Sequence, residues 1–277
     1  MTGVDFTKMH GLGNDFMVID NRDGSIGLNG ETVRRWSDRH TGIGFDQLLV
    51  VNAPSVEEAE FDYQIFNADG EEVEHCGNGA RCFARFVTER QLTKSRSINV
   101  NTALGIITLQ LQHDDQVMVK MGVPQFEPQH IPFIADKRSD FYALDVDGQH
   151  FEVGAASIGN PHVLIRVDDL HIADVERIGQ LVERHERFPN RVNVGFMQIM
   201  DWQHIRLRVF ERGVGETRAC GTGACAAVAI AHSQGLLDKT AIVSLPGGDL
   251  KIDWPNVHAS IEMTGPCSTV FEGQTRM

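Results

Sequence analysis

The chain has 277 residues, of which 42% are hydrophobic and 23% charged, and its formal net charge is −13. This composition excludes a disordered protein, which would have too few apolar residues to form a core. The negative charge disfavours nucleic acid and anionic membranes as partners, since both would repel an acidic surface. The sequence contains neither the apolar core of a signal peptide nor an apolar run long enough to span a bilayer, so we expect a cytoplasmic protein.

The first half of the chain alternates segments that predict strands with two that predict helices. The expected strands are β-branched or alternating runs bounded by Gly, Asn and Asp. They lie at 16–21, 46–52, 62–67, 97–102, 105–112 and 116–122. Segment 30–40 predicts a surface helix, and segment 79–92 predicts a longer one. Pro and polar residues at 121–132 interrupt the periodicity and indicate a seam.

The second half of the sequence repeats the first. "FNADGEEVEHCGNGARCFARF", from Phe66, aligns without a gap with "FERGVGETRACGTGACAAVAI", from Phe210, so Cys76 and Cys220 correspond at an offset of 144. Two further pairs of blocks precede the cysteine blocks in the same order in each half. They are 31–40 with 176–185, at an offset of 145, and 13–19 with 159–165, at an offset of 146. Gln47 and Asn193 then fall at equivalent positions.

This duplication predicts two homologous lobes, 1–121 and 122–265. Each is expected to be a curved, mostly antiparallel sheet around one central helix, which is an α+β arrangement of two pseudo-symmetric lobes. The central helix of the second lobe, 223–237, is apolar on nearly every side, and such a helix is usually buried.

Cys76 and Cys220 each precede a Gly-X-Gly turn from which a helix is expected to start. At the positive end of a helix, the pKa of a thiol is expected to fall from about 8.5 toward roughly 3.5–7.5. The backbone N–H groups that follow suit a carboxylate. Two thiols facing one substrate across a cleft between the lobes predict racemisation: one thiolate takes a proton from the carbon next to the carboxylate, and the other thiol returns one. Helix N-termini would stabilise the carbanion with no metal or cofactor.

Seven blocks of the sequence resemble the diaminopimelate epimerase family. They are "KMHGLGNDF" (8–16), "RHTGIGFDQLL" (39–49), "IFNADGEEVEHCGNGARCFARF" (65–86), "GNPHVLI" (159–165), "RVNVGFMQI" (191–199), "ERGVGETRACGTGACA" (211–226) and "LPGGDLKI" (245–252). The resemblance implies a diaminopimelate epimerase-like fold with its active site between the lobes. It also implies an isomerase that interconverts LL- and meso-diaminopimelate without pyridoxal phosphate or any other cofactor, on the route to lysine and peptidoglycan precursors.

By motif position, the resemblance implies that Cys76 and Cys220 are the two catalytic bases and that His162 and Glu211 tune their protonation. It implies a substrate-binding set consisting of Asn14, Gln47, Asn67, Gly77, Asn78, Asn160, Asn193, Glu211, Arg212, Gly221 and Thr222. It further implies that the segment 266–277 returns to the N-terminal lobe and that the protein is a homodimer with Phe271 near the contact.

The sequence departs from the family pattern at two positions. Thr222 stands where Ser is expected, which keeps a hydroxyl. Phe271 stands where relatives often carry Tyr. It lacks the hydroxyl for a hydrogen bond between subunits, although packing by the ring can still hold a dimer.

Three alternatives remain open at this point. A proline racemase or hydroxyproline epimerase would use the same two cysteines on a substrate without a distal amino-acid group. A non-catalytic zinc protein would bind metal through Cys76, Cys82, Cys220, Cys225 and nearby histidines, although their spacing is looser than usual. Oxidation could also join Cys76 to Cys220 as a redox switch. We expect Cys82, Cys225 and Cys267 to pack in the core, and His75 to be a surface or packing residue.

Overall fold

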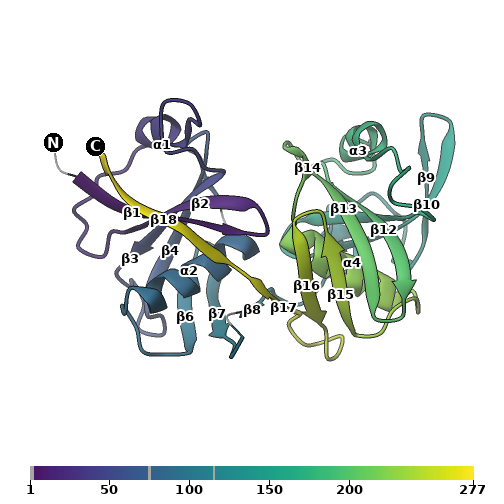
Figure 1. Ribbon diagram of the computed structural model, residues 1–277. Helices are drawn as coiled ribbons and strands as arrows, with labels where there is room; N and C mark the ends of the chain where they lie inside the picture. The colour runs from purple at the N-terminus through teal and green to yellow at the C-terminus, as the bar shows by residue number, and fades with distance from the viewer. Residues whose placement is uncertain (1–2, 74–75, 115) are drawn as a thin grey trace. The chain divides into compact units, whose positions relative to one another are not determined.

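Figure 1 shows the computed structural model, which describes residues 3–73, 76–114 and 116–277. The chain forms two compact units: Met1–Lys120 together with Gly265–Met277, and Met121–Thr264. Both units combine strands with helices, which confirms the predicted α+β class. His75 lies outside the described residues.

The first unit is a sheet whose strands pair in the order β18–β1–β2–β3–β4–β6–β7–β8. The pairs β2–β3 and β4–β6 are parallel, the others are antiparallel, and the short β5 pairs with β4. The elements are β1 (Gly3–Gly11), β2 (Asn14–Asp20), α1 (Gly30–Ser37), β3 (Gln47–Asn52), β4 (Phe61–Asn67), β5 (Glu72–Val73), α2 (Gly77–Glu89), β6 (Ser97–Thr102), β7 (Gly105–Leu111), β8 (Gln116–Lys120) and β18 (Ser268–Arg276).

The second unit has the same pairing order, β9–β10–β11–β12–β13–β15–β16–β17, with β14 on β13. Its two parallel pairs, β11–β12 and β13–β15, stand at the equivalent places. After a short 3₁₀ turn at Pro128–His130, its elements are β9 (Tyr142–Val146), β10 (Gln149–Ser157), β11 (Pro161–Arg166), α3 (Val175–Glu183), β12 (Asn193–Asp201), β13 (His204–Glu211), β14 (Gly215–Thr217), α4 (Gly221–Ser233), β15 (Thr240–Leu245), β16 (Gly248–Asp253) and β17 (Glu262–Pro266). The repeat seen in the sequence is therefore a repeat of topology.

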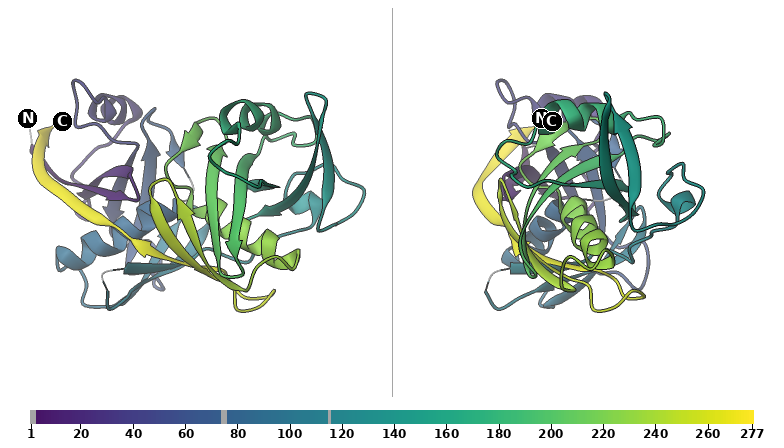
Figure 2. Two further views of the ribbon diagram at one scale, coloured as in Figure 1. Left: turned by 45° about the vertical axis from the view of Figure 1, so that its right-hand side comes forward. Right: turned by 90° about the vertical axis from the view of Figure 1, so that its right-hand side faces the viewer.

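Each sheet curves around one helix, α2 in the first unit and α4 in the second (Figures 1 and 2). Helix α2 contacts β1, β2, β3, β7 and β8, and α4 contacts β10 to β13, β15 and β16. Most residues of α4 are buried, many of them alanines, as its uniformly apolar sequence predicts. Small side chains let the strands approach α4 closely: an added Cβ at Gly154 of β10 would stand 2.2 Å from Cγ2 of Ile230.

The C-terminal segment returns to the first unit, as the family resemblance implied. β18 runs antiparallel to β1, from Gly3 opposite Arg276 to His10 opposite Ser268. The carbonyl of Arg276 also accepts a hydrogen bond from the Trp36 indole at 3.3 Å. β1 was absent from the strands expected from the sequence.

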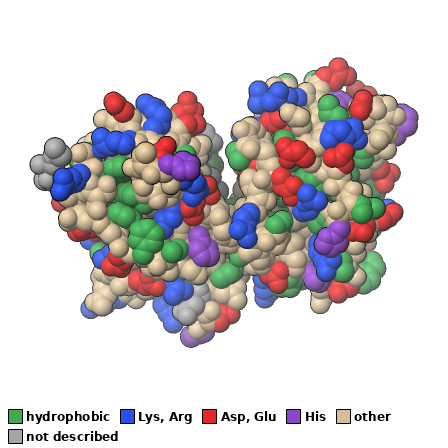
Figure 3. Space-filling view, turned by 45° about the horizontal axis from the view of Figure 1, so that its top comes forward, with side chains coloured by type: hydrophobic (Ala, Val, Ile, Leu, Met, Phe, Trp, Pro, Cys, Tyr) green, Lys and Arg blue, Asp and Glu red, His purple; other side chains and the backbone are tan. Residues whose placement is uncertain are grey.

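Acidic and basic side chains are interspersed over the face of each unit that Figure 3 presents. Within the described part of the chain, every helix is too short or too polar to cross a membrane.

Candidate active site

Cys76 is the N-cap residue of helix α2 and directly precedes its first residue, Gly77. Its sulfur accepts a hydrogen bond from the backbone N–H of Gly79 at 3.4 Å, so the thiol lies at the positive end of the helix, as expected. The Cys76 Sγ also lies 3.7 Å from Oδ1 of Asn14 on β2, and Asn78 donates to the same oxygen at 3.2 Å. The structure thus gathers three of the predicted site residues around the start of α2.

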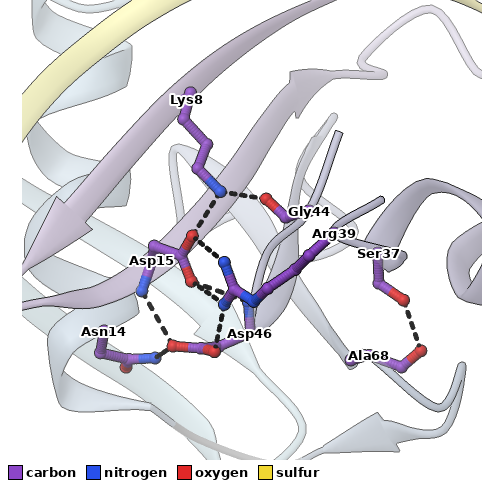
Figure 4. A network of polar contacts seen from close by, with 8 residues as sticks. All are labelled: Lys8, Asn14, Asp15, Ser37, Arg39, Gly44, Asp46 and Ala68. Atoms are coloured by element: carbon purple, nitrogen blue, oxygen red, sulfur yellow. Dashed lines mark hydrogen bonds and ion pairs between the residues drawn. The ribbon is translucent and has the colours of Figure 1, made fainter. Parts of the chain in front are cut away.

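A cluster of charges behind Asn14 holds it in place (Figure 4). Asp46 accepts hydrogen bonds from Nδ2 of Asn14 at 2.9 Å and from the backbone N–H of Asp15 at 3.1 Å. Arg39 binds both oxygens of Asp15 and one oxygen of Asp46, and Lys8 binds Asp15. Burial would raise the pKa of Asp15, but the hydrogen bonds and charges of Arg39 and Lys8 outweigh it and hold this pKa well below its usual range. All four charged residues lie within the sequence blocks that resemble the family, and Asp46 directly precedes Gln47, but none of them was predicted to belong to the site.

Gln47 and Asn67 form a second pair of amides in the first unit. They stand opposite each other at the ends of β3 and β4, and Nε2 of Gln47 donates to Oδ1 of Asn67 at 2.9 Å. Oε1 of Gln47 is buried and has no hydrogen-bond partner among the described residues. A buried acceptor without a partner costs free energy, so this oxygen is poised for a ligand that donates a hydrogen bond.

Cys220 occupies the same N-cap position on α4. It is only 3% exposed, and its Sγ donates to Oε2 of Glu211 at 3.2 Å. Thr217 donates to the other oxygen of Glu211 at 2.5 Å and so holds that carboxylate against the sulfur. The Thr222 hydroxyl lies 3.6 Å from the same sulfur, so the side chain that replaces Ser contacts the cysteine directly.

The expectation of a lowered pKa is wrong for Cys220. Burial raises the pKa of this thiol well above its usual value, and the negative charge of Glu211 raises it further. Hydrogen bonds from Thr222 and Gly223 favour the thiolate but are outweighed. At neutral pH, Cys220 therefore holds its proton, because the helix dipole is weaker than desolvation plus an adjacent carboxylate.

Asn160 and His162 lie together beside the start of α4. Asn160 donates to the Thr222 hydroxyl at 3.4 Å, and its Oδ1 is 2.9 Å from Nε2 of His162. Burial lowers the pKa of His162 to about 3, with the charge of Arg212 adding to the effect. The imidazole is therefore neutral at physiological pH, and its Nε2 contacts the side chain of Asn160.

Asn193 joins the start of β12 to the turn after β13. Its Nδ2 donates to the carbonyl of Pro161 at 3.0 Å, and its Oδ1 accepts from the backbone N–H of Arg212 at 3.0 Å. The Arg212 guanidinium is exposed and donates to the carbonyl of Asn190 at 3.2 Å. Asn193 thus fixes the backbone that carries Arg212 and Glu211.

The other three cysteines are buried as expected: Cys82 in α2, Cys225 in α4 and Cys267 just before β18. All five cysteines are thiols rather than disulfides. Across residues 3–73, 76–114 and 116–277, no three His, Cys, Asp or Glu side chains converge as metal ligands, so the described residues lend the zinc alternative no support.

The comparisons with known proteins agree with one another. The family model described as diaminopimelate epimerase matches residues 6–127 and 154–270. Diaminopimelate epimerase from Pseudomonas syringae pv. syringae (strain B728a) is 54% identical over 272 residues, covering 98% of this chain and 99% of the relative, and that from Azotobacter vinelandii (strain DJ / ATCC BAA-1303) shows the same identity and coverage. A hydroxyproline epimerase structure from Agrobacterium vitis shares the fold, with a TM-score of 0.72 at 15% identity, covering 98% of this chain and 92% of its own.

Proposed function

The chain belongs to the diaminopimelate epimerase family, and we propose that it interconverts LL- and meso-diaminopimelate in the synthesis of lysine and peptidoglycan precursors. One observation carries this proposal: each unit places a cysteine at the N-cap of its central helix, at matching positions of a duplicated topology. A 1,1-proton transfer that inverts a carbon needs two such groups, one to remove a proton and one to supply a proton.

In the proposed reaction, Cys76 as thiolate removes the proton from the α-carbon, and the C–H bonding pair stays on carbon as a carbanion. The thiol of Cys220 then delivers its proton to the opposite face, leaving Cys76 protonated and Cys220 as thiolate. In the reverse direction, the two cysteines exchange roles. The raised pKa of Cys220 supports its assignment as the proton donor of the first direction.

The start of each central helix would stabilise the carbanion. Its charge spreads onto the substrate carboxylate, and the backbone N–H groups at a helix N-terminus attract such charge. We assign this role to the backbone of Gly77, Asn78, Gly221 and Thr222. In this mechanism, the two cysteines and the backbone N–H groups at the helix starts carry out the proton transfer without a cofactor.

The remaining substrate contacts are assigned by chemistry. A diamino diacid presents two ammonium groups and two carboxylates, so it needs acceptors as well as donors. Oε1 of Gln47, which is buried and has no partner in the described part of the chain, suits an ammonium. The exposed Arg212 suits a bidentate carboxylate. We propose that Asn14, Asn67, Asn160, Asn193 and Glu211 complete the set and that His162 tunes protonation through Asn160.

We further propose that the protein acts as a cytoplasmic homodimer. Five cysteines kept as thiols fit a reducing compartment. The sheet strand β18 pairs with β1 and exposes Val270 and Phe271, the latter 48% exposed and edge-on to Phe6 at 5.9 Å between ring centroids. Hydrophobic side chains also gather on the face of the first unit in Figure 3. Sedimentation of the wild type as a dimer, and of Phe271→Asp as a monomer, would support this contact; a wild-type monomer would refute the dimer.

Turnover in deuterium oxide tests the function. With LL-diaminopimelate, we expect the meso isomer to appear with deuterium at the inverted carbon, because the proton is supplied by a thiol that has exchanged with solvent. L-Proline should remain unlabelled and keep its configuration, since it has no distal group for Arg212 and the amides. Labelling of proline without labelling of diaminopimelate would instead favour the racemase alternative.

A further inference from the structure

The charged cluster behind Asn14 has no counterpart in the second unit. At the offset of 146 that relates Asn14 to Asn160, Pro161 stands at the position equivalent to Asp15, and Val192 stands at the position equivalent to Asp46. In the second unit, the equivalent asparagine instead contacts the ring of His162. The cluster is thus a feature of the first unit alone, added to a frame that is otherwise duplicated.

The hydrogen bonds of Asp46 decide which way the Asn14 carboxamide faces. A carboxylate only accepts hydrogen bonds, so the group that Asn14 turns toward Asp46 must be its NH₂. The carboxamide oxygen then necessarily points the other way, toward the Cys76 sulfur at 3.7 Å and Nδ2 of Asn78 at 3.2 Å. Arg39 and the backbone N–H of Asp15 hold the Asp46 carboxylate in place.

We infer that Asp46, braced by Arg39, is a positioning residue that fixes Asn14 with its oxygen toward the Cys76 thiol. In this orientation Asn14 accepts a hydrogen bond from the S–H group but offers none to a thiolate. This fixed orientation of Asn14, called the lock below, therefore favours the protonated form of Cys76. That form must supply a proton in the reverse reaction. The meaning of the lock for catalysis rests on the proposed function, whereas the lock itself can be measured without turnover.

Other groups around Cys76 act from fixed positions. From α2, Arg81 donates to Oδ1 of Asn78 at 2.9 Å. From β4, Tyr63 is buried, and burial together with the charge of Cys76 raises the pKa of its hydroxyl. From β1, β2 and the loop before β3 come Lys8, Asp15, Arg39 and Asp46. The cluster formed by Lys8, Arg39, Asp15 and Asp46 has no net charge. A variant that keeps it neutral can therefore separate an effect of Asn14 orientation from an effect of charge.

Asp46→Asn is the primary test. Asn at this position can donate as well as accept, so Asn14 is free to turn its NH₂ toward the sulfur and stabilise the thiolate. Alkylation of Cys76 by iodoacetamide, followed by peptide mass spectrometry between about pH 6 and about pH 10, reports the fraction of thiolate. We expect the midpoint of the Cys76 profile to fall by about one pH unit, the size of one hydrogen bond.

The double variant Arg39→Gln with Asp46→Asn removes one charge of each sign and keeps the cluster neutral. A midpoint that stays low in this variant supports reorientation of Asn14. A return to the wild-type midpoint would show that Asp46 acts only through its charge and would overturn the inference, as would an unchanged midpoint in Asp46→Asn alone. Asp20→Asn, the same change at the end of β2 opposite Asn14, is the matched control and should leave the profile unchanged.

Folding and function do not confound these outcomes. The Asp46 side chain is 44% exposed and Asn is isosteric with Asp, so the variant should fold; Asp46→Ala offers a second way to remove the acceptor, with the same expected direction. Alkylation needs no substrate. A shifted midpoint in a protein that fails to turn over diaminopimelate would therefore support the lock while rejecting the proposed function.

Discussion

Cys76→Ser and Cys220→Ser are each expected to lower the rate of epimerisation by more than about 10²-fold. A serine hydroxyl is too weak an acid to exchange a proton with carbon at neutral pH, and in the proposed reaction each cysteine must both remove and supply protons. Substrate binding should persist, because the amides and the helix N-termini remain. The measurement is the rate of LL-to-meso conversion together with deuterium uptake at the α-carbon.

Cys82→Ala is the matched control for the cysteine variants. Cys82 lies in the same helix as Cys76, six residues on, but its side chain is fully buried and its pKa is raised by burial. Its loss should cost some stability through a small cavity while leaving turnover near the wild-type rate. Near-normal turnover in either serine variant would reject the two-base mechanism.

Arg81→Met is expected to lower the free energy of unfolding by about 3 kcal/mol. The Arg81 side chain is fully buried within the first unit. Its guanidinium donates to the carbonyl of Pro266 at 3.2 Å, to the carbonyl of Gly77 at 3.4 Å and to Oδ1 of Asn78 at 2.9 Å. Met fills similar space but leaves these buried acceptors without that donor, and each loss costs free energy. Urea unfolding would measure the change.

Arg85→Met, one turn further along α2, is the control for Arg81. Arg85 is partly exposed and forms an i,i+4 pair with Glu89 at 2.7 Å. An exposed pair of this kind contributes at most about 0.5 kcal/mol, so the loss of stability should be much smaller than for Arg81→Met. Equal losses of stability in the two variants would show that the buried contacts of Arg81 carry no special weight.

Because Arg81 also holds Asn78 and Gly77, the Arg81→Met variant should lose activity at temperatures where it remains folded.

Much of the fold could be read from the linear pattern. Gap-free repetition identified the two lobes, and the uniformly apolar "GACAAVAIAHSQGLL" predicted the burial of α4. The paired cysteines were placed correctly at helix starts, because Gly-X-Gly before an apolar run is a local signal that depends on neighbouring residues only. β1 escaped prediction because its glycines and mixed polar residues give a weak strand signal, and its main partner β18 lies at the far end of the chain.

The sequence nominated residues for the site, but it could not give the electrostatics around them. The pKa of Cys220 is set by burial and by Glu211, which reaches the sulfur from the end of β13. The orientation of Asn14 is set by Asp46, 32 residues away along the chain. Neither contact follows from sequence spacing.

Residue order alone shows that this chain is built twice around two cysteines, because a repeat is a property of the sequence. The raised pKa of Cys220 and the orientation of Asn14 beside Cys76 depend instead on tertiary contacts. Desolvation and charge act through space at a few ångströms, so they depend on which distant residues the sheets bring against each helix start. In the second unit, the carboxylate of Glu211 contacts the sulfur of Cys220. In the first unit, the carboxylate of Asp46 instead contacts Asn14, the asparagine that faces Cys76.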